Sequence, residues 1–163
     1  MKEGPRCFLH AKKDIVKYLV ECGAYINKED EYSVTPLYIS CENGYEDVVQ
    51  YLVEHGADVN IEDISGWIPL YVACNEGYEN IVKYFVEEGE DINEQDYRGK
   101  TPLFIVCSNG HSTIVKYLVK HGADINKEDK YGAIPLYIAS EKGYKDIVQY
   151  LTEQRANINK ETK

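Results

Sequence analysis

The stretch from Thr35 to Asn60, TPLYISCENGYEDVVQYLVEHGADVN, contains the pattern that predicts the structure of this chain. It begins with a Thr-Pro pair, passes through small residues to Gly44, and then carries a dense apolar run that ends at Gly56. A Thr-Pro pair is typical of a helix start, because the hydroxyl accepts a backbone hydrogen bond and Pro lacks an N–H that would have no helical partner there. Glycine ends helices because it adopts the left-handed conformation at little cost. The stretch therefore predicts two short helices, one on each side of Gly44.

The same order of residues recurs along the chain at a step of 33 residues. The positions that keep this step include Pro36, Pro69, Pro102 and Pro135; Gly44, Gly77, Gly110 and Gly143; and Asn27, Asn60, Asn93, Asn126 and Asn159. A fixed period of this length is the signature of a repeat protein. The second helix of each repeat has apolar residues at positions equivalent to 48, 49, 52 and 53, which make a wide apolar stripe. One partner helix cannot cover such a stripe, so the repeats are expected to stack on one another.

The repeat closely resembles the ankyrin repeat. The resemblance is carried by Thr-Pro-Leu-Tyr at 35–38, Asn-Gly-Tyr at 43–45 and the apolar run that ends in Gly-Ala-Asp-Val-Asn at 56–60, and it extends over residues 14–159. It implies an all-α fold, an ankyrin-repeat solenoid of about five units, built from stacked antiparallel helix pairs with β-hairpin fingers. The expected organisation is a single ankyrin-repeat domain, 1–163. Its parts are a partial N-terminal repeat at 1–29, full repeats at 30–62, 63–95 and 96–128, and a C-terminal repeat and tail at 129–163.

The chain departs from the family pattern at several positions. The residues in the slot that is His in the family are Tyr38, Tyr71, Phe104 and Tyr137. The polar links of that His must therefore be replaced or absent. Ile68 and Ile134 stand where Thr35 and Thr101 supply a helix cap, at a cost of about 1 kcal/mol each. Arg155 occupies a slot that is otherwise Gly, which predicts a strained or frayed end of the last helix.

The two ends of the chain look like cuts through a longer array. The first unit lacks its finger, and a last finger is expected to begin after Asn159. Neither end is clearly a polar capping repeat. End-to-end self-association or fraying is expected if the chain exists alone.

The net charge of −10 over 163 residues limits the classes of partner. An acidic surface repels nucleic acid and anionic membranes, so neither is expected as a partner. A basic partner, or an acidic surface kept only for solubility, fits better, and the charge does not choose between the two. No apolar stretch reaches the roughly 18 residues of a membrane helix, and Met1 to His10 lacks the apolar core of a secretory signal.

The five cysteines do not form the spacing of a zinc site or a disulfide framework. Cys41, Cys74 and Cys107 share one slot of the repeat, in which Ser140 comes next. This pattern predicts a small buried slot in a reducing, cytoplasmic compartment. His55 and His121 share a slot at the ends of predicted helices, where an exposed histidine is favoured over a metal ligand. No cofactor or metal is expected.

An enzyme is disfavoured because the sequence holds no nucleophile elbow, phosphate loop, HExxH or dinucleotide fingerprint. The acidic pairs Glu62-Asp63 and Glu128-Asp129 recur with the repeat, which predicts hydrogen bonds in the finger turns.

Many of the 15 tyrosines keep the step of the repeat and are interpreted as packing residues. The set expected in the core of the second helices is Tyr18, Tyr51, Tyr84, Tyr117 and Tyr150. The row of Tyr38, Tyr71, Phe104 and Tyr137 is expected in the core or between repeats, with partner contact as the alternative. For Tyr45, Tyr78 and Tyr144 the two interpretations remain equally open.

Positions that change from repeat to repeat are the candidates for recognition, because stacking does not dictate them. By resemblance to the family they line the concave face and the finger tips. The candidate partner-binding residues are Ile64, Ser65, Trp67, Asn75, Glu76, Tyr97, Arg98, Lys100, Ser108, Asn109, Lys130 and Tyr131. Ile64, Trp67, Tyr97 and Arg98 have the composition of interface hot spots. Packing of Trp67 on a neighbouring finger is the alternative.

The sequence thus predicts a protein–protein interaction module that binds a protein partner through its concave face and finger tips. The alternative is a structural spacer or scaffold segment of a longer multidomain ankyrin protein. The resemblance also implies Asn60, Asn93 and Asn126 as candidates for asparaginyl β-hydroxylation, although finger hydrogen bonds already explain why they recur.

Overall fold

The computed structural model describes the backbone of residues 5–161 and the side chains of residues 12–154. Within these residues the chain forms nine helices and no β-strand, which confirms the all-α prediction. The chain divides into two compact units, residues 1–84 and 85–163, which are described one at a time.

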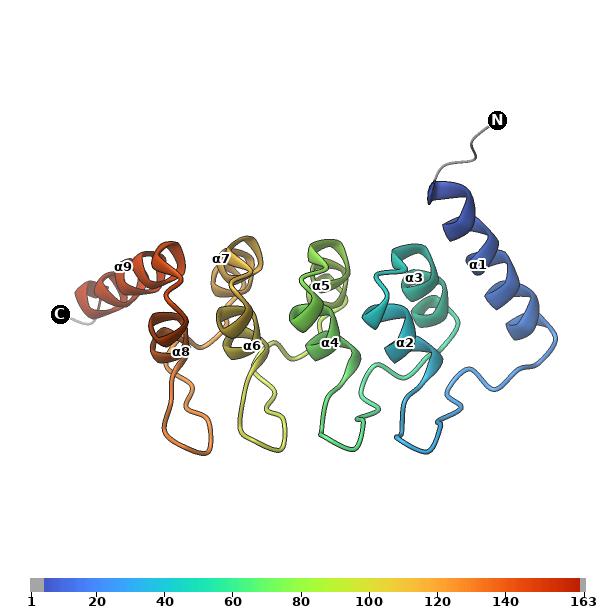
Figure 1. Cartoon of the computed structure of the whole chain (residues 1–163), viewed down its shortest axis with the longest axis horizontal. Helices are drawn as coiled ribbons and strands as arrows, with labels where there is room; N and C mark the ends of the chain where they lie inside the picture. The colour runs from blue at the N-terminus through green and yellow to red at the C-terminus, as the bar shows by residue number, and fades with distance from the viewer. Residues whose placement is uncertain (1–4, 162–163) are drawn as a thin grey trace. The chain divides into compact units, whose positions relative to one another are not determined.

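The first unit holds α1 (Pro5–Glu21), α2 (Pro36–Glu42), α3 (Glu46–Glu54), α4 (Pro69–Glu76) and the beginning of α5 (Glu79–Glu87). The short helix α2 packs against α3, its partner in the same repeat, and against α4 of the next repeat. α1 packs against α3, as Figure 1 shows. Successive repeats therefore stack in the way that the wide apolar stripe predicts.

The second unit holds the end of α5, then α6 (Pro102–Asn109), α7 (Ser112–Lys120), α8 (Pro135–Lys142) and α9 (Lys145–Glu161). α6 pairs with α7, α8 pairs with α9, and the two pairs meet through contacts of α6 with α8 and of α7 with α9. The stack of the first unit is thus repeated with the same order of elements (Figure 1).

The helix starts follow the sequence. The hydroxyls of Thr35 and Thr101 accept hydrogen bonds of 3.2 Å from the backbone N–H groups three residues later. Ile68 and Ile134 begin their helices without a side-chain cap, as their apolar side chains require. Gly110 ends α6 in the left-handed conformation, with φ of 81°.

The core lies between the helices of each pair and between neighbouring pairs. Leu37 and Leu52 are buried in the first unit, and Leu103 and Leu118 in the equivalent slots of the second. The three in-phase cysteines Cys41, Cys74 and Cys107 are also fully buried, which confirms the predicted slot, and Ser140 of the last repeat is exposed. Burial raises the pKa of the Cys107 thiol to about 12 and that of the other two thiols well above the usual value.

The first and last helices are longer than the others because each lacks a glycine that ends a helix in the other repeats. α1 and α9 each have 17 residues, whereas the helices between them have seven to nine. In both long helices a slot that is otherwise Gly holds a good helix former, Ala11 in α1 and Arg155 in α9. The predicted frayed end at Arg155 is therefore wrong. The helix avoids a strained left-handed residue by continuing to Glu161, through Asn159, where a finger was expected.

Two tyrosines expected to pack are exposed instead. Tyr18 is 66 % exposed, whereas Tyr51 in the same slot is buried, because residues 5–11 extend α1 instead of forming a separate helix that would cover it. Tyr137 is 60 % exposed, and the finger that would face it is replaced by the last turns of α9. The other three tyrosines expected in the core of the second helices are partly buried, namely Tyr84, Tyr117 and Tyr150.

None of the helices in the described part of the chain is long and apolar enough to cross a membrane.

Candidate partner-binding surface

Four hairpin loops, which we call fingers 1 to 4, precede the helices α2, α4, α6 and α8. They comprise residues 22–35, 55–68, 88–101 and 121–134. Within each unit the two fingers project to the same side of the helices (Figure 1). Each finger closes with a backbone hydrogen bond, such as that of 3.0 Å from the N–H of Asp63 to the carbonyl of Trp67.

One aspartate fixes the turn at the tip of every finger. In finger 3, the Asp96 carboxylate accepts the backbone N–H groups of Arg98 at 2.9 Å and Lys100 at 2.8 Å. Asp30, Asp63 and Asp129 accept the N–H groups two and four residues ahead in the same way. This arrangement confirms the turn hydrogen bonds predicted for Asp63 and Asp129. It holds the side chains between these N–H groups in a defined position.

An asparagine joins one finger to the next. In the first unit, Asn27 accepts the N–H of Asp58 at 2.9 Å and donates its amide to the carbonyl of Gly56 at 3.5 Å. In the second unit, Asn93 makes the equivalent bonds to the next finger at 2.8 and 3.2 Å. These bonds explain why asparagine keeps the step of the repeat.

The finger tips also meet through their backbones. The N–H of Ile64 donates to the carbonyl of Tyr32 at 3.2 Å in the first unit, and the N–H of Lys130 donates to the carbonyl of Arg98 at 2.9 Å in the second. At Gly99 a Cβ would lie 2.9 Å from the backbone nitrogen of Lys130, so only glycine allows this approach. Each pair of tips therefore forms one continuous surface.

The tyrosine that replaces the family histidine supplies a new polar link. The Tyr38 hydroxyl donates to the Asp63 carboxylate of the next finger at 2.8 Å. Burial, and then the bonded carboxylate of Asp63, raise the pKa of Tyr38 well above its usual value. The link expected to be replaced or absent is therefore replaced at this position, while Tyr71 and Phe104 are buried.

Two of the tyrosines left open by the sequence pack on glycine. The ring of Tyr78 lies against Gly44, where a Cβ would come within 2.5 Å of it. The ring of Tyr144 lies against Gly110, where a Cβ would come within 2.6 Å of it. Tyr45 contacts Lys12, whose ammonium group lies 3.9 Å from the centre of its ring. All three contacts join neighbouring repeats, which favours packing over partner contact.

In the first unit the candidate residues divide between tip and helix. Ile64 is 65 % exposed at the tip of finger 2, beside the exposed Ser65. Trp67 is partly buried and stacks on Tyr71, with ring centres 6.4 Å apart, which supports a packing role. The last two candidates of this unit, Asn75 and Glu76, lie at the end of α4 and are joined by a hydrogen bond of 2.8 Å.

In the second unit four candidates gather at the joined tips. Tyr97 is 55 % exposed and Tyr131 is 86 % exposed, and the charged side chains of Arg98 and Lys130 are also exposed. Lys100 is partly buried, with its ammonium group 5.2 Å from the centre of the Phe104 ring. The remaining candidates, Ser108 and Asn109, lie at the end of α6, away from the tips.

The candidate residues leave out the tip of finger 1, which carries Glu31 and Tyr32. Tyr32 is 54 % exposed and lies at the tip of finger 1, where its carbonyl is bonded to Ile64. It occupies the same slot of the repeat as Ser65, Arg98 and Tyr131, and that slot was the available signal.

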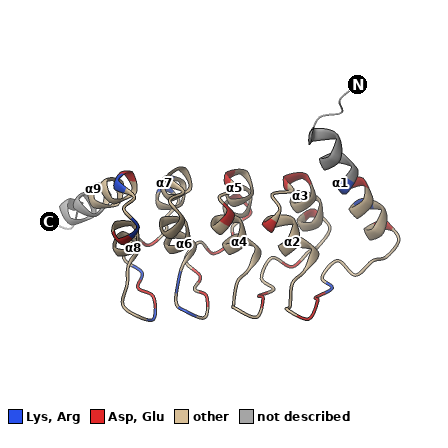
Figure 2. Cartoon of the chain, in the orientation of Figure 1, with Lys and Arg blue, Asp and Glu red and all other residues tan. Residues whose placement is uncertain are grey.

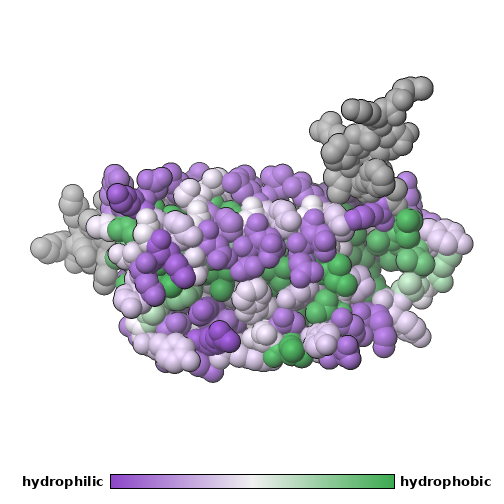
Figure 3. All heavy atoms as spheres, in the orientation of Figure 1, coloured by the Kyte–Doolittle hydropathy of each residue, from purple (hydrophilic) through white to green (hydrophobic). Residues whose placement is uncertain are grey.

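The electrostatic character of the fingers differs between the units. Figure 2 shows lysine and arginine on the fingers that precede α6 and α8. In the first unit, the tips of fingers 1 and 2 carry Glu31 and Ile64 in the slot that holds Tyr97 and Lys130 in the second. Figure 3 shows the hydrophobic surface at the tip of the finger that precedes α4.

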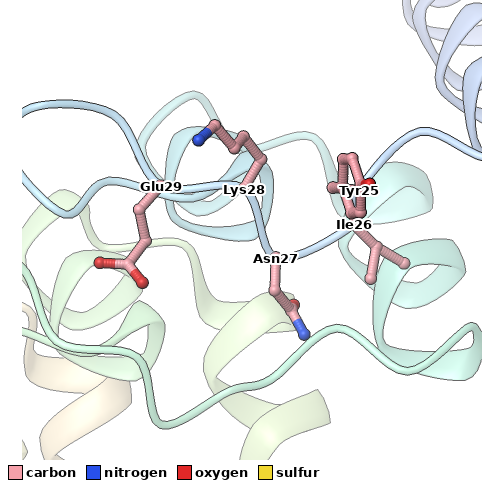
Figure 4. Close-up of a pocket in the computed structure, with 5 residues that line it drawn as sticks. All are labelled: Tyr25, Ile26, Asn27, Lys28 and Glu29. Carbon is pink, nitrogen blue, oxygen red and sulfur yellow. The ribbon is translucent and has the colours of Figure 1, made fainter.

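A pocket of about 500 Å³ lies along finger 1, lined by residues 25–29. Figure 4 shows that Asn27, Lys28 and Glu29 point in different directions, so their polar atoms do not converge on a common ligand. Asn27 is also occupied by its bonds to finger 2. Within the described residues, no three His, Cys, Asp or Glu side chains gather as a metal site.

The histidines predicted at helix ends lie there. The ring nitrogen Nδ1 of His55 lies 2.7 Å from the carbonyl oxygen of Tyr51, and that of His121 lies 2.8 Å from the carbonyl of Tyr117. Both histidines are exposed, so the predicted exposed position is confirmed.

Comparison with known proteins gives one finding. A family model described as ankyrin repeats (3 copies) matches residues 7–96 and again residues 88–162. No curated protein sequence matches the chain significantly.

Proposed function

The chain belongs to the ankyrin repeat family, whose domains generally bind proteins and are typically non-catalytic, and we propose that it binds a protein partner through its finger tips and the adjoining ends of α4 and α6. The observation that carries this proposal is the contrast between a fixed finger backbone and variable exposed side chains. Ile64, Tyr97 and Tyr131 are large side chains, each more than half exposed, on turns that aspartate carboxylates hold in position.

The fixed turns support binding because they lower the entropy that association must overcome. A flexible loop loses conformational freedom when a partner orders it, and a turn with its backbone hydrogen bonds already made loses little. Aromatic side chains on such a turn supply contact area with few rotatable bonds. The residues that recur in every repeat thus stabilise the stack, and the residues that vary between repeats contact the partner.

The experiment that tests the proposal is a pull-down from extract of the source cells, with captured proteins identified by mass spectrometry. The bait is compared with an Ile64→Ala/Trp67→Ala variant and with a Gln50→Ala control, which changes an exposed residue on α3. Truncation of a hot spot weakens binding by about 2 kcal/mol or more. We expect a protein that the wild type and the control retain and that the double variant loses.

Circular dichroism must first show that the double variant is folded, because Trp67 also stacks on Tyr71. The single variant Ile64→Ala changes only the exposed tip, so it separates loss of contact from loss of packing. Equal retention of every captured protein by all four baits would contradict the proposal and favour the spacer or scaffold interpretation.

A further inference from the structure

The joined tips of fingers 3 and 4 differ in charge from the rest of this acidic chain. We call the group of Tyr97, Arg98, Lys100, Lys130 and Tyr131 the basic tip. Three of its five residues are cations, in a chain with a net charge of −10. The equivalent slots of fingers 1 and 2 hold no cation, so the stack itself does not require positive charge there.

The fold brings the cations of the basic tip together. Arg98 and Lys130 are 32 positions apart in the sequence, yet the backbone hydrogen bond from the N–H of Lys130 to the carbonyl of Arg98 joins their residues directly. A second contact, from the amide of Gln95 to the carbonyl of Glu128 at 3.0 Å, fixes the same two fingers below the tips. The close approach at Gly99 completes the contact.

The two aspartates nearest in sequence to the cations of the basic tip already accept hydrogen bonds from backbone N–H groups. Asp96 is only 5 % exposed, and its carboxylate accepts two backbone N–H groups. Asp129 is partly buried and accepts two N–H groups in the same way. Glu128, the neighbour of Asp129 in the sequence, is an exposed carboxylate. Within the described residues, neither Arg98 nor Lys130 forms a salt bridge with a carboxylate.

From this arrangement we propose that the basic tip binds a short acidic segment of a protein partner, with Arg98 and Lys130 facing its carboxylates and the rings of Tyr97 and Tyr131 packing on its apolar side chains. The proposal rests on the protein-binding function proposed above and names the chemistry of the partner. An arginine guanidinium suits this role because it donates two parallel hydrogen bonds to one carboxylate.

The overall negative charge favours a short segment over a long polyanion. At physiological salt the Debye length is about 8 Å, so a peptide on the basic tip responds mainly to the charges of the tip. A nucleic acid extends beyond the tip, and the net charge of −10 on the whole chain repels its phosphates. The expectation of a basic partner, drawn from the net charge, therefore does not apply to this part of the surface.

The test is fluorescence anisotropy at physiological salt with three labelled probes. They are a short peptide of glutamate and leucine, the same peptide with glutamine for glutamate, and a single-stranded oligonucleotide of equal charge. The variant Arg98→Gln/Lys130→Gln removes two cations from the tip. The variant Lys116→Gln/Lys120→Gln is the matched control, because it removes two exposed cations from α7 of the same unit.

We expect the glutamate peptide to bind the wild type and the α7 control alike, and to bind the tip variant about tenfold more weakly. The glutamine peptide is expected to bind the wild type about tenfold more weakly than the glutamate peptide does. A further variant, Gly99→Ala, keeps every side chain of the tip but forces the two fingers apart, and it should also weaken binding.

Three results would overturn the proposal. They are no binding of the glutamate peptide, equal binding by the two double variants, and preference for the oligonucleotide. Failure here leaves the protein-binding function testable on its own, because the pull-down uses substitutions in finger 2 and does not involve the basic tip.

Discussion

The contact of Tyr144 with Gly110 predicts a difference between two substitutions that look equivalent in the sequence. Gly110 and Gly143 end α6 and α8 with nearly the same backbone, at φ of 81° and 79°. Alanine at either site is strained in the left-handed conformation by about 1 to 2 kcal/mol. About half of this cost is offset because alanine restricts the unfolded chain more than glycine does. Gly143→Ala is therefore expected to lower the free energy of unfolding by about 1 kcal/mol.

Gly110→Ala carries a further cost because its Cβ meets a ring. The new Cβ would lie 2.6 Å from Cε1 and 2.7 Å from Cζ of Tyr144, whereas at Gly143 it would meet nothing within 4 Å. Carbon atoms in contact are normally about 3.5 to 4.0 Å apart, so the ring must retreat by about 1 Å. Overpacking of this kind costs about 1 to 3 kcal/mol. The total expected for Gly110→Ala is about 2 to 4 kcal/mol.

Urea unfolding followed by circular dichroism measures the difference. The variants are compared at a common slope, since repeat arrays do not always unfold in one step. Removal of the ring in Gly110→Ala/Tyr144→Ala should reduce the cost of the alanine to that of Gly143→Ala. Equal stability of the two single variants would show that the ring of Tyr144 does not obstruct a Cβ at residue 110, because the backbone strain at the two sites is matched and only the ring differs.

Four other changes test separate features of the stack. Ser33→Gly should stabilise the chain by about 1 kcal/mol in urea unfolding, because Ser33 lies in the left-handed region at φ of 60°; a lower midpoint would contradict this. Thr101→Ala should cost about 1 kcal/mol by loss of the helix cap, and an unchanged midpoint would exclude a role for the hydroxyl. Burial raises the pKa of Cys107 from 9.0 to about 12, so the free energy of unfolding should be constant below pH 9 and fall as the pH rises toward 12. The fall for this thiol is about 1.4 kcal/mol per pH unit, and urea midpoints at several pH values should show a shallower dependence for Cys107→Ala. Tyr18→Glu should abolish any rise of the sedimentation coefficient with concentration if copies associate through the exposed face of α1, and an equal rise in both proteins would place self-association elsewhere.

The features that keep the period of the repeat could be predicted because the same local chemistry acts in every copy. Thr35 and Thr101 cap their helices, and Asp63 and Asp129 fix their turns, by bonds made within a few residues. Such bonds depend on sequence neighbours alone. A single copy of the motif therefore predicts them.

The features that depend on the neighbouring repeat were harder to predict. Tyr18 and Tyr51 share a slot, but burial of the slot requires a separate covering helix, and residues 5–11 extend α1 instead. Arg155 was expected to strain a helix end, whereas the chain had the alternative of a longer helix. In each case the slot of the residue in the repeat was assigned correctly, but the structure around that slot differs from that in the other repeats.

The binding surface was only partly predictable for the same reason. The sequence identified variable slots, including those of Arg98 and Lys130, but it did not show that a backbone hydrogen bond joins the two tips. It also left the role of Tyr144 open, because the contact with Gly110 depends on how one repeat lies on the preceding one.

The contacts of Tyr78 with Gly44 and of Tyr144 with Gly110 have a consequence for how such a chain can be rearranged. Each tyrosine belongs to one copy of the motif and requires a glycine from the copy before it. If one repeat is moved behind a repeat that has a bulkier residue in place of this glycine, its tyrosine ring will clash with that residue. Recombination, in nature or in the laboratory, therefore keeps this contact intact when it exchanges neighbouring repeats together. The unit that can be exchanged without a clash is thus longer than one 33-residue repeat.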